Sequence, residues 1–269
     1  MRQYICVTCG TQYPASEQPP AGCPICLDDR QYVNPHGQQW TTLEEIRLDH
    51  RNRFIPLEPG VTAILPEPKV GIGQRAHLIE TPAGNILWDC VALIDDETVA
   101  EIERRGGLAG IALSHPHYYT TQVEWSRAFG DVPIYLHAAL RPYVMRPDPV
   151  IQYWEGETLR LGEGLTLINA GVHFDGGTVL HWAGGAEGQG ALLAGDIFQV
   201  VQDRRWVSFM YSYPNLIPER PAIIREALRR VEPYAFDHLY GAWWDRKVIG
   251  DAKGAVWRSA DRYLAQVES

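Results

Sequence analysis

Four of the five cysteines fall within the first 26 residues, where they form two C-x-x-C pairs. Cys6 and Cys9 make the first pair, and Cys23 and Cys26 make the second, with 13 residues between the pairs. Pairs at this spacing can hold one metal ion in a four-thiolate site. Because a segment of about 35 residues buries too little apolar surface to fold alone, the ion supplies most of its folding free energy. We therefore expect a metal module in residues 1–35.

The metal in this module is predicted from the local sequence. Residues 4–10, Tyr13 and residues 22–26 resemble a zinc ribbon and, more narrowly, the rubredoxin-like domain of rubrerythrins. Zinc in a ribbon is structural, whereas iron in a rubredoxin-like site carries electrons, and four thiolates suit both metals. We expect zinc, the usual occupant at this spacing, with iron as the alternative. Disulfides are not expected, since the first residues lack the apolar core of a secretory signal.

Composition limits the class of protein and its partners. The 269 residues are 45% hydrophobic and 21% charged, as in folded soluble proteins, which excludes a disordered chain. The net charge of −9 argues against nucleic acid as a partner. No apolar run approaches the roughly 18 residues of a membrane span. We expect a cytoplasmic protein that acts on a small molecule, with homo-oligomerisation left open.

Beyond the metal module, the chain alternates between short strands and helices. Residues 36–52 begin just after Pro35 and contain Gly37, followed by a short helix capped by Thr41 or Thr42. We therefore predict a connector over residues 36–52 and a main domain over residues 53–269. Strand-length apolar runs cover residues 61–65, 76–80, 85–90, 108–113, 134–136, 165–170, 178–182 and 191–194. Helical patterns cover residues 95–105, 121–129, 218–231 and 253–267. This order favours a layered α/β sandwich over a doubly wound sheet.

Metal-binding side chains follow several of these predicted strands. His115 and His117 come directly after the apolar run 111–113, and residues two apart in extended backbone point to one side. His173 and Asp196 likewise follow apolar runs, and Gly195 lets the backbone turn before the carboxylate. Neutral imidazole is a common ligand of zinc and iron. The sequence therefore predicts one zinc or iron ion held by His115, His117, His173 and Asp196, with room for a water.

From about residue 53 to the end, the order of these motifs resembles the metallo-β-lactamase superfamily. The resemblance rests on a strand that ends in Asp89, the His115-Pro-His117 pair, His173 before glycines, and Gly195-Asp196. It implies a four-layer αβ/βα sandwich with the four ligands along one edge. Asp89 is expected to hydrogen-bond a ligand imidazole rather than bind the ion.

The sequence departs from the family where a second metal would bind. The family's histidine loop continues with Asp and His, whereas this chain has Tyr119 and Thr120. The family's final His-Gly is Tyr240-Gly241 here. If that stretch is extended, His238 shares a face with Tyr240 and could reach the site in its place. We expect a single ion at the histidine site.

A bound divalent ion lowers the pKa of water from 15.7 toward about 7. We therefore expect a metal-dependent hydrolase that uses a metal-bound hydroxide on an ester, thioester or phosphoester. Asp196 is the expected base or orienting group, and Tyr119 or Tyr118 the expected donor. Two alternatives stay open: a redox protein with iron at the four cysteines, and a non-catalytic metal-stabilised binding protein.

Overall fold

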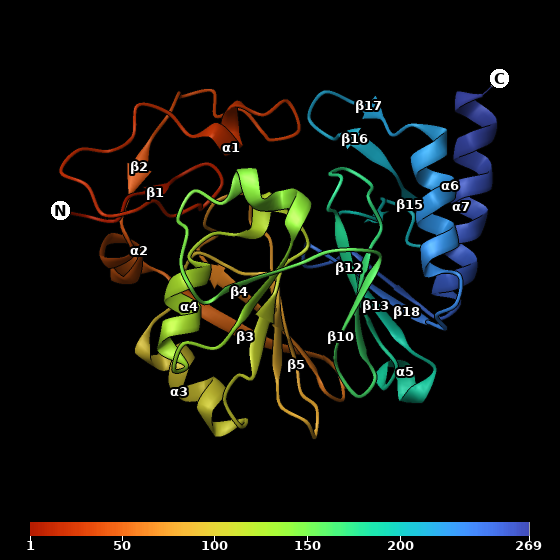
Figure 1. The fold of residues 1–269 in the computed structure, drawn as a ribbon, viewed down its shortest axis with the longest axis horizontal. Helices are drawn as coiled ribbons and strands as arrows, with labels where there is room; N and C mark the ends of the chain where they lie inside the picture. The colour runs from red at the N-terminus through yellow and green to blue at the C-terminus, as the bar shows by residue number, and fades with distance from the viewer. Residues whose placement is uncertain (269) are drawn as a thin grey trace. The chain divides into compact units, whose positions relative to one another are not determined.

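The computed structural model describes residues 1–268, whose contacts divide the chain into two units (Figure 1). The first unit comprises Met1–Leu136 and Leu140–Tyr153, and the second comprises residues 137–139 and the chain from Trp154 onward. Each unit is built on one large sheet. The predicted domain boundaries at residues 35 and 52 stay a prediction, because both positions lie inside the first unit.

The sheet of the first unit has seven strands in the order β3-β4-β5-β6-β7-β8-β9. The strands from β3 to β6 pair antiparallel, whereas β6 with β7 and β7 with β8 pair parallel. Their bounds are β3 Arg51–Glu58, β4 Val61–Glu67, β5 Ala76–Ile79, β6 Ile86–Trp88, β7 Gly110–Ala112, β8 Ile134–His137 and β9 Ile151–Trp154. The apolar runs predicted between residues 61 and 136 are confirmed as β4 to β8.

Local capping explains where the helices of the first unit begin. Thr42 and Glu45 form a reciprocal capping box at the start of α2 (Leu43–Asp49), which confirms the predicted cap. The Asp95 side chain accepts the Thr98 N–H at the start of α3 (Asp96–Arg104). In α4 (Gln122–Ala128) the Trp125 ring N–H donates to the Val91 carbonyl at 2.9 Å. Short 3₁₀ turns cover Pro116–Tyr118 and Ala138–Tyr143.

The N-terminal segment is organised around its cysteines. Strand β1 (Ile5–Cys6) pairs antiparallel with β2 (Trp40–Thr41), and a short helix α1 covers Pro24–Leu27. Its buried cluster contains Cys6, Cys9, Tyr13, Cys23 and Ile25, with Trp40, Tyr143 and Met145 packed against it. Since Tyr143 and Met145 lie more than a hundred residues away in the sequence, the segment packs on the rest of its own unit.

The sheet of the second unit has six strands in the order β10-β11-β12-β13-β18-β19, and only the β13–β18 pairing is parallel. The bounds are β10 Thr158–Gly162, β11 Leu165–Asn169, β12 Thr178–Trp182, β13 Ala191–Gly195, β18 His238–Gly241 and β19 Lys247–Ile249. The strands β14 (Gln199–Val200) and β15 (Val207–Ser208) form a small pair, and β16 (Met210–Ser212) and β17 (Ile217–Pro218) form another. A short helix, α5 (Gly185–Gly188), lies between β12 and β13.

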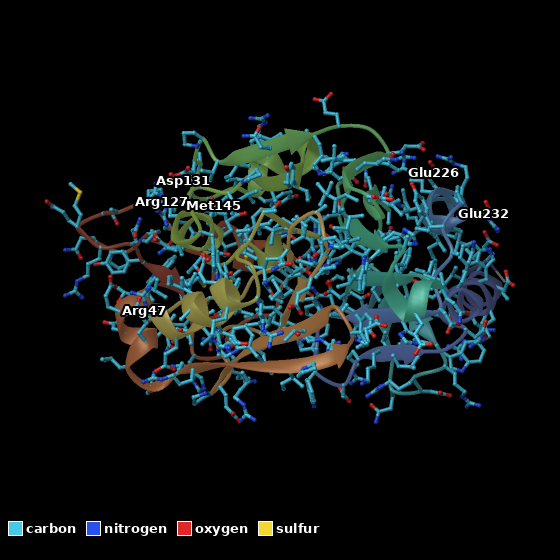
Figure 2. All side chains as sticks on the ribbon, turned by 90° about the horizontal axis from the view of Figure 1, so that it is seen from below. Arg47, Arg127, Asp131, Met145, Glu226 and Glu232 are labelled. Atoms are coloured by element: carbon cyan, nitrogen blue, oxygen red, sulfur yellow. The ribbon has the colours of Figure 1, made fainter. Side chains whose placement is uncertain are left out.

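Two helices complete the second unit, α6 (Pro221–Val231) and α7 (Ala252–Val267), which lie side by side in Figure 1. Both were predicted, although α6 begins at Pro221 because the preceding residues 217–218 form β17. Buried Ile224, Ala227 and Val231 of α6 join the apolar core of this unit. Glu226 and Glu232 lie on the outer side of the helix (Figure 2). Within residues 1–268, none of the helices has the length and apolarity that a membrane crossing requires.

Candidate metal centres

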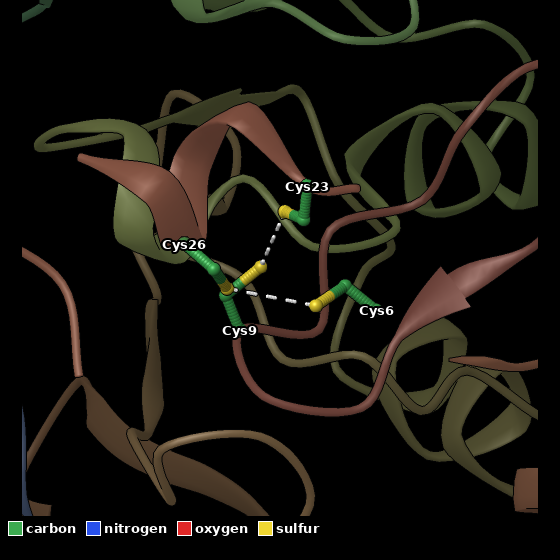
Figure 3. A group of neighbouring side chains, drawn as sticks. All are labelled: Cys6, Cys9, Cys23 and Cys26. Carbon is green, nitrogen blue, oxygen red and sulfur yellow. Dashed lines mark hydrogen bonds between the residues drawn. The ribbon is translucent and has the colours of Figure 1, made fainter. Parts of the chain in front are cut away.

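The four predicted thiols of the N-terminal segment converge (Figure 3). The Sγ atoms of Cys6 and Cys26 are 3.6 Å apart, as are those of Cys9 and Cys23, and all four sulfurs lie within 4.8 Å of one another. A tetrahedral site with metal–sulfur distances of about 2.3 Å places its sulfurs about 3.8 Å apart. All four thiols are free rather than joined in disulfides. The geometry therefore fits one tetrahedral ion.

Polar groups surround these sulfurs. Tyr13 Oη donates to Cys23 Sγ at 3.1 Å, and Gln38 Nε2 donates to Cys6 Sγ at 3.3 Å. Burial raises the pKa of the Tyr13 hydroxyl, so it keeps the proton that it donates. Such donors stabilise negative charge on sulfur and orient the ligands around the ion.

In the first unit, His115 and His117 lie together just after β7. Both are buried, their ring centroids are 4.8 Å apart, and each offers a donor atom within 4.8 Å of the other's. Asp89 follows the neighbouring parallel strand β6, so it reaches the same edge of the sheet. The pair follows the end of β7, as expected, but His117 lies in the 3₁₀ turn Pro116–Tyr118 and not in extended backbone as predicted.

Asp89 acts on His115 through Ser114. Asp89 Oδ1 accepts the Ser114 backbone N–H at 2.8 Å and the Ser114 hydroxyl at 2.8 Å. Because the Ser114 hydrogen is used in this way, Ser114 Oγ accepts from His115 Nδ1, at 3.0 Å. This chain of hydrogen bonds fixes the tautomer in which His115 Nε2 carries the lone pair that a metal needs. Ser114 was not predicted, although it stands next to His115 in the sequence.

Tyr119 and Thr120 face the N-terminal segment. The Gln12 N–H donates to the Thr120 carbonyl at 3.1 Å, and a Cβ placed on Gly10 would lie 3.2 Å from Thr120 Cγ2. Tyr119 lines a cavity of about 10 Å³ with Thr11 and Gln12, and its hydroxyl has no hydrogen-bond partner among residues 1–268. Burial raises the pKa of Tyr119. The neighbouring Tyr118 instead packs edge-on against the His115 ring, with centroids 4.5 Å apart.

In the second unit, His173 and Asp196 lie together. They follow β11 and β13, which run in the same direction in the sheet, and their donor atoms lie within 4.8 Å of each other. Both are buried. His173 has φ +66°, a left-handed conformation that costs a non-glycine residue roughly 1 kcal/mol.

One segment, residues 210–219, contacts both residues of this pair. His173 Nδ1 donates to the Tyr211 carbonyl at 2.7 Å, which leaves Nε2 as the lone-pair nitrogen. The His173 backbone N–H donates to Glu219 Oε2 at 3.0 Å. Tyr213 packs against the His173 ring at 5.4 Å and donates its hydroxyl to the Asp196 carbonyl at 2.7 Å. We call residues 210–219 the clamp segment.

His238 does not lie near Asp196. The stretch is extended, as the prediction required, but His238 pairs with Ala191 at the opposite end of β13. Asp196 follows Ala191 by five positions along extended backbone, a distance of about 16 Å. The suggestion that His238 reaches the site is therefore wrong. Its ring Nδ1 is instead 3.3 Å from Tyr240 Oη.

Comparison with known proteins places the chain in a family. No family model matches it. The uncharacterized protein YmaE of Bacillus subtilis (strain 168) is 48% identical over 271 residues, covering 100% of this chain and 98% of YmaE.

Solved structures show the fold. The metallo-β-lactamase FIM-1 from Pseudomonas aeruginosa, in its mono-zinc form, is 12% identical with a TM-score of 0.55 over 80% of this chain and 96% of FIM-1. The metal-soaked Flv1 flavodiiron core from Synechocystis sp. PCC6803 is 15% identical with a TM-score of 0.57 over 82% of this chain and 62% of its own. These likenesses confirm the predicted α/β fold class. The chain therefore belongs to the family of YmaE, has the fold of the metallo-β-lactamases, and carries a four-cysteine cluster in its N-terminal segment.

Proposed function

We propose that the protein is a metal-dependent hydrolase whose active site holds one zinc or iron ion between the His115–His117 pair and the His173–Asp196 pair. The small-molecule substrate is an ester, a thioester or a phosphoester. The observation that carries the proposal is the tautomer control at both pairs: Ser114 Oγ holds His115 Nδ1, and the Tyr211 carbonyl holds His173 Nδ1. Both histidines thus keep Nε2 as a ligand atom.

The residues present suit such an ion. Three imidazoles and one carboxylate form a donor set that binds zinc or iron, and all four side chains are buried. When bound, a divalent ion there supplies Lewis acidity that activates water and polarises the substrate's carbonyl or phosphoryl oxygen. Metallo-β-lactamase structures among the neighbours support hydrolysis as the class of reaction.

The side chains around the proposed ion would have separate roles in hydrolysis. Asp196 is suited to accept a proton from the attacking water or to orient it, while Tyr213 fixes the Asp196 backbone. Tyr118 covers the His115 ring and limits its exposure to solvent. The donor role of Tyr119 stays a prediction. This residue lines the cavity beside Thr11 and Gln12.

We propose one ion at this site rather than two. Tyr119 and Thr120 occupy the positions of the family's second-metal ligands, and neither side chain is a usual ligand for zinc. The N-terminal segment covers this side of the loop through the Gln12–Thr120 hydrogen bond and the Gly10 contact.

For the four cysteines we propose structural zinc. The sulfur distances of 3.6 Å and the burial of the cluster suit a closed tetrahedral site. A colourless preparation supports zinc. A red protein that dithionite bleaches would instead show iron and favour the redox alternative.

Turnover tests the hydrolase proposal. Chromogenic esters, thioesters and phosphoesters are offered to the wild-type protein and to the His117→Ala variant, with His36→Ala as a control because His36 is exposed. We expect hydrolysis by the wild type and by His36→Ala, and a loss of at least about 100-fold in His117→Ala. Equal turnover in His117→Ala, or none in the metal-loaded wild type across the three classes, would overturn the proposal.

A further inference from the structure

The clamp segment holds His173 at a backbone position that a histidine does not adopt readily. His173 has φ +66°, in the left-handed region, and it follows Gly171 and Val172 in a tight turn between β11 and β12. Its backbone N–H points into the unit's interior, where an unpaired amide is costly. The group that accepts this N–H therefore decides whether the turn keeps its shape.

That acceptor is the Glu219 carboxylate. Glu219 is only 5% exposed, and its Oε2 accepts the His173 N–H at 3.0 Å. Its other oxygen, Oε1, accepts the Arg220 N–H at 2.9 Å. A charged acceptor makes a shorter and stronger hydrogen bond than a neutral one, so Glu219 is suited to hold a strained turn.

Glu219 is itself fixed from two sides. Its own N–H is bonded to the Phe209 carbonyl at 3.2 Å and to the Tyr263 hydroxyl of α7 at 2.7 Å. Tyr211, eight residues earlier, accepts His173 Nδ1. The same short segment thus fixes both the backbone and the ring of His173, and α7 anchors that segment to the core.

We propose that Glu219 is the positioning residue for His173: its buried carboxylate holds the His173 turn so that Nε2 is presented to the metal. This inference rests on the proposed function, since His173 is a ligand only if the histidine site binds an ion. Glu219 acts through His173 and does not itself touch the ion or the substrate.

Two substitutions at Glu219 weaken or remove the group that accepts the His173 N–H. Glu219→Gln keeps the shape and an acceptor oxygen but loses the charge, and Glu219→Leu removes both acceptors. Glu226→Leu is the control, because Glu226 lies on the outer side of α6 (Figure 2) and pairs with Arg229 and Arg230. Zn²⁺ is titrated into each full-length metal-free protein in competition with a chromophoric chelator, which gives the affinity for the second equivalent.

We expect that affinity to fall about three- to tenfold in Glu219→Gln, more than tenfold in Glu219→Leu, and not at all in Glu226→Leu. Wild-type affinity in both Glu219 variants would overturn the inference. If the leucine variant does not fold, the glutamine variant decides: an unchanged affinity there contradicts the assignment. An equal loss of zinc affinity in Glu219→Gln and Glu219→Leu also contradicts the assignment.

A second measurement separates this inference from the proposed function. Hydrogen exchange of the His173 amide in the metal-free proteins reports its hydrogen bond whether or not an ion binds. We expect exchange at least tenfold faster in Glu219→Gln than in the wild type. If the His173 amide exchanges slowly in the wild type and equally slowly in the Glu219 variants, the role of Glu219 is overturned. A wild type that binds two Zn²⁺ without hydrolysing any substrate overturns only the proposed function.

Discussion

At the scale of single residues, the proposed histidine site depends on hydrogen bonds to the ring nitrogens that would face away from a bound ion. Ser114 serves His115, and the Tyr211 carbonyl serves His173. Each bond is formed by a neighbour that has no metal-binding chemistry of its own. The site is therefore sensitive to residues that an inspection of ligands alone would overlook.

Removal of the Ser114 hydroxyl tests this dependence. In Ser114→Ala the Asp89–Ser114–His115 chain is broken and His115 Nδ1 loses its acceptor, so we expect the affinity for the second zinc equivalent to fall about tenfold. The control is Ser126→Ala, since Ser126 is also buried in the first unit but bonds to the Val132 carbonyl. Chelator competition measures both. Equal affinity in the two variants would contradict the role of Ser114.

The ligand candidates could be predicted from the sequence, but their supports could not all be. His115, His117, His173 and Asp196 each follow an apolar run, and that local pattern is visible without a structure. Asp89 was expected to support a ligand imidazole because of the family resemblance. Glu219 lies 46 residues from His173 and follows only a two-residue strand, so no local periodicity connects them. The placement of His238 failed because residue periodicity gives the face of a strand but not its register.

At the scale of elements, the N-terminal segment packs on the loop that carries His115 and His117. The helices 95–105 and 253–267 were predicted closely because their periodicity and caps are local, as the observed α3 and α7 show. The packing of Gly10 on Thr120 could not be predicted, since it joins residues 110 apart in the sequence. Gly10 has φ +78°, and a Cβ there would lie 3.2 Å from Thr120 Cγ2, closer than an ordinary van der Waals contact.

The Gly10 contact predicts a difference between two glycine substitutions. Gly37 has φ +79° and open space around it, so Gly37→Ala should cost about 1 kcal/mol of unfolding free energy, from backbone strain alone. Gly10→Ala adds a tight contact with Thr120 Cγ2 and should cost roughly 1 kcal/mol more. Urea unfolding at a fixed zinc concentration measures the difference. Equal costs would show that the segment does not pack tightly on the loop.

At the scale of the whole molecule, several histidines outside the predicted ligands are buried in neutral form. Burial lowers the pKa of His77, His137 and His181. For His181 it outweighs the hydrogen bond between Nε2 and the Ala235 carbonyl, at 2.7 Å, which raises the pKa. The unfolded chain takes up protons on these groups near pH 6.5, whereas the folded protein does so only at lower pH. Their contribution to stability is therefore complete above about pH 6.5 and is lost as the pH falls below it.

His181 gives this pH dependence a test. Each histidine that must stay neutral steepens the loss of unfolding free energy by up to about 1.4 kcal/mol per pH unit. His181→Gln should flatten the slope between pH 6.5 and 5, measured by urea unfolding in the metal-free protein. His36→Gln, at an exposed position, should keep the wild-type slope. Parallel slopes for wild type and His181→Gln would contradict this account.

In the proposed protein, histidines from two distant parts of the chain share one ion, while the cysteines hold another. Inductively coupled plasma mass spectrometry of the purified protein counts these ions. We predict two equivalents per chain in the wild type, and one equivalent in both His117→Ala and His173→Ala. One equivalent in the wild type, three equivalents, or two retained in either variant would contradict the claim.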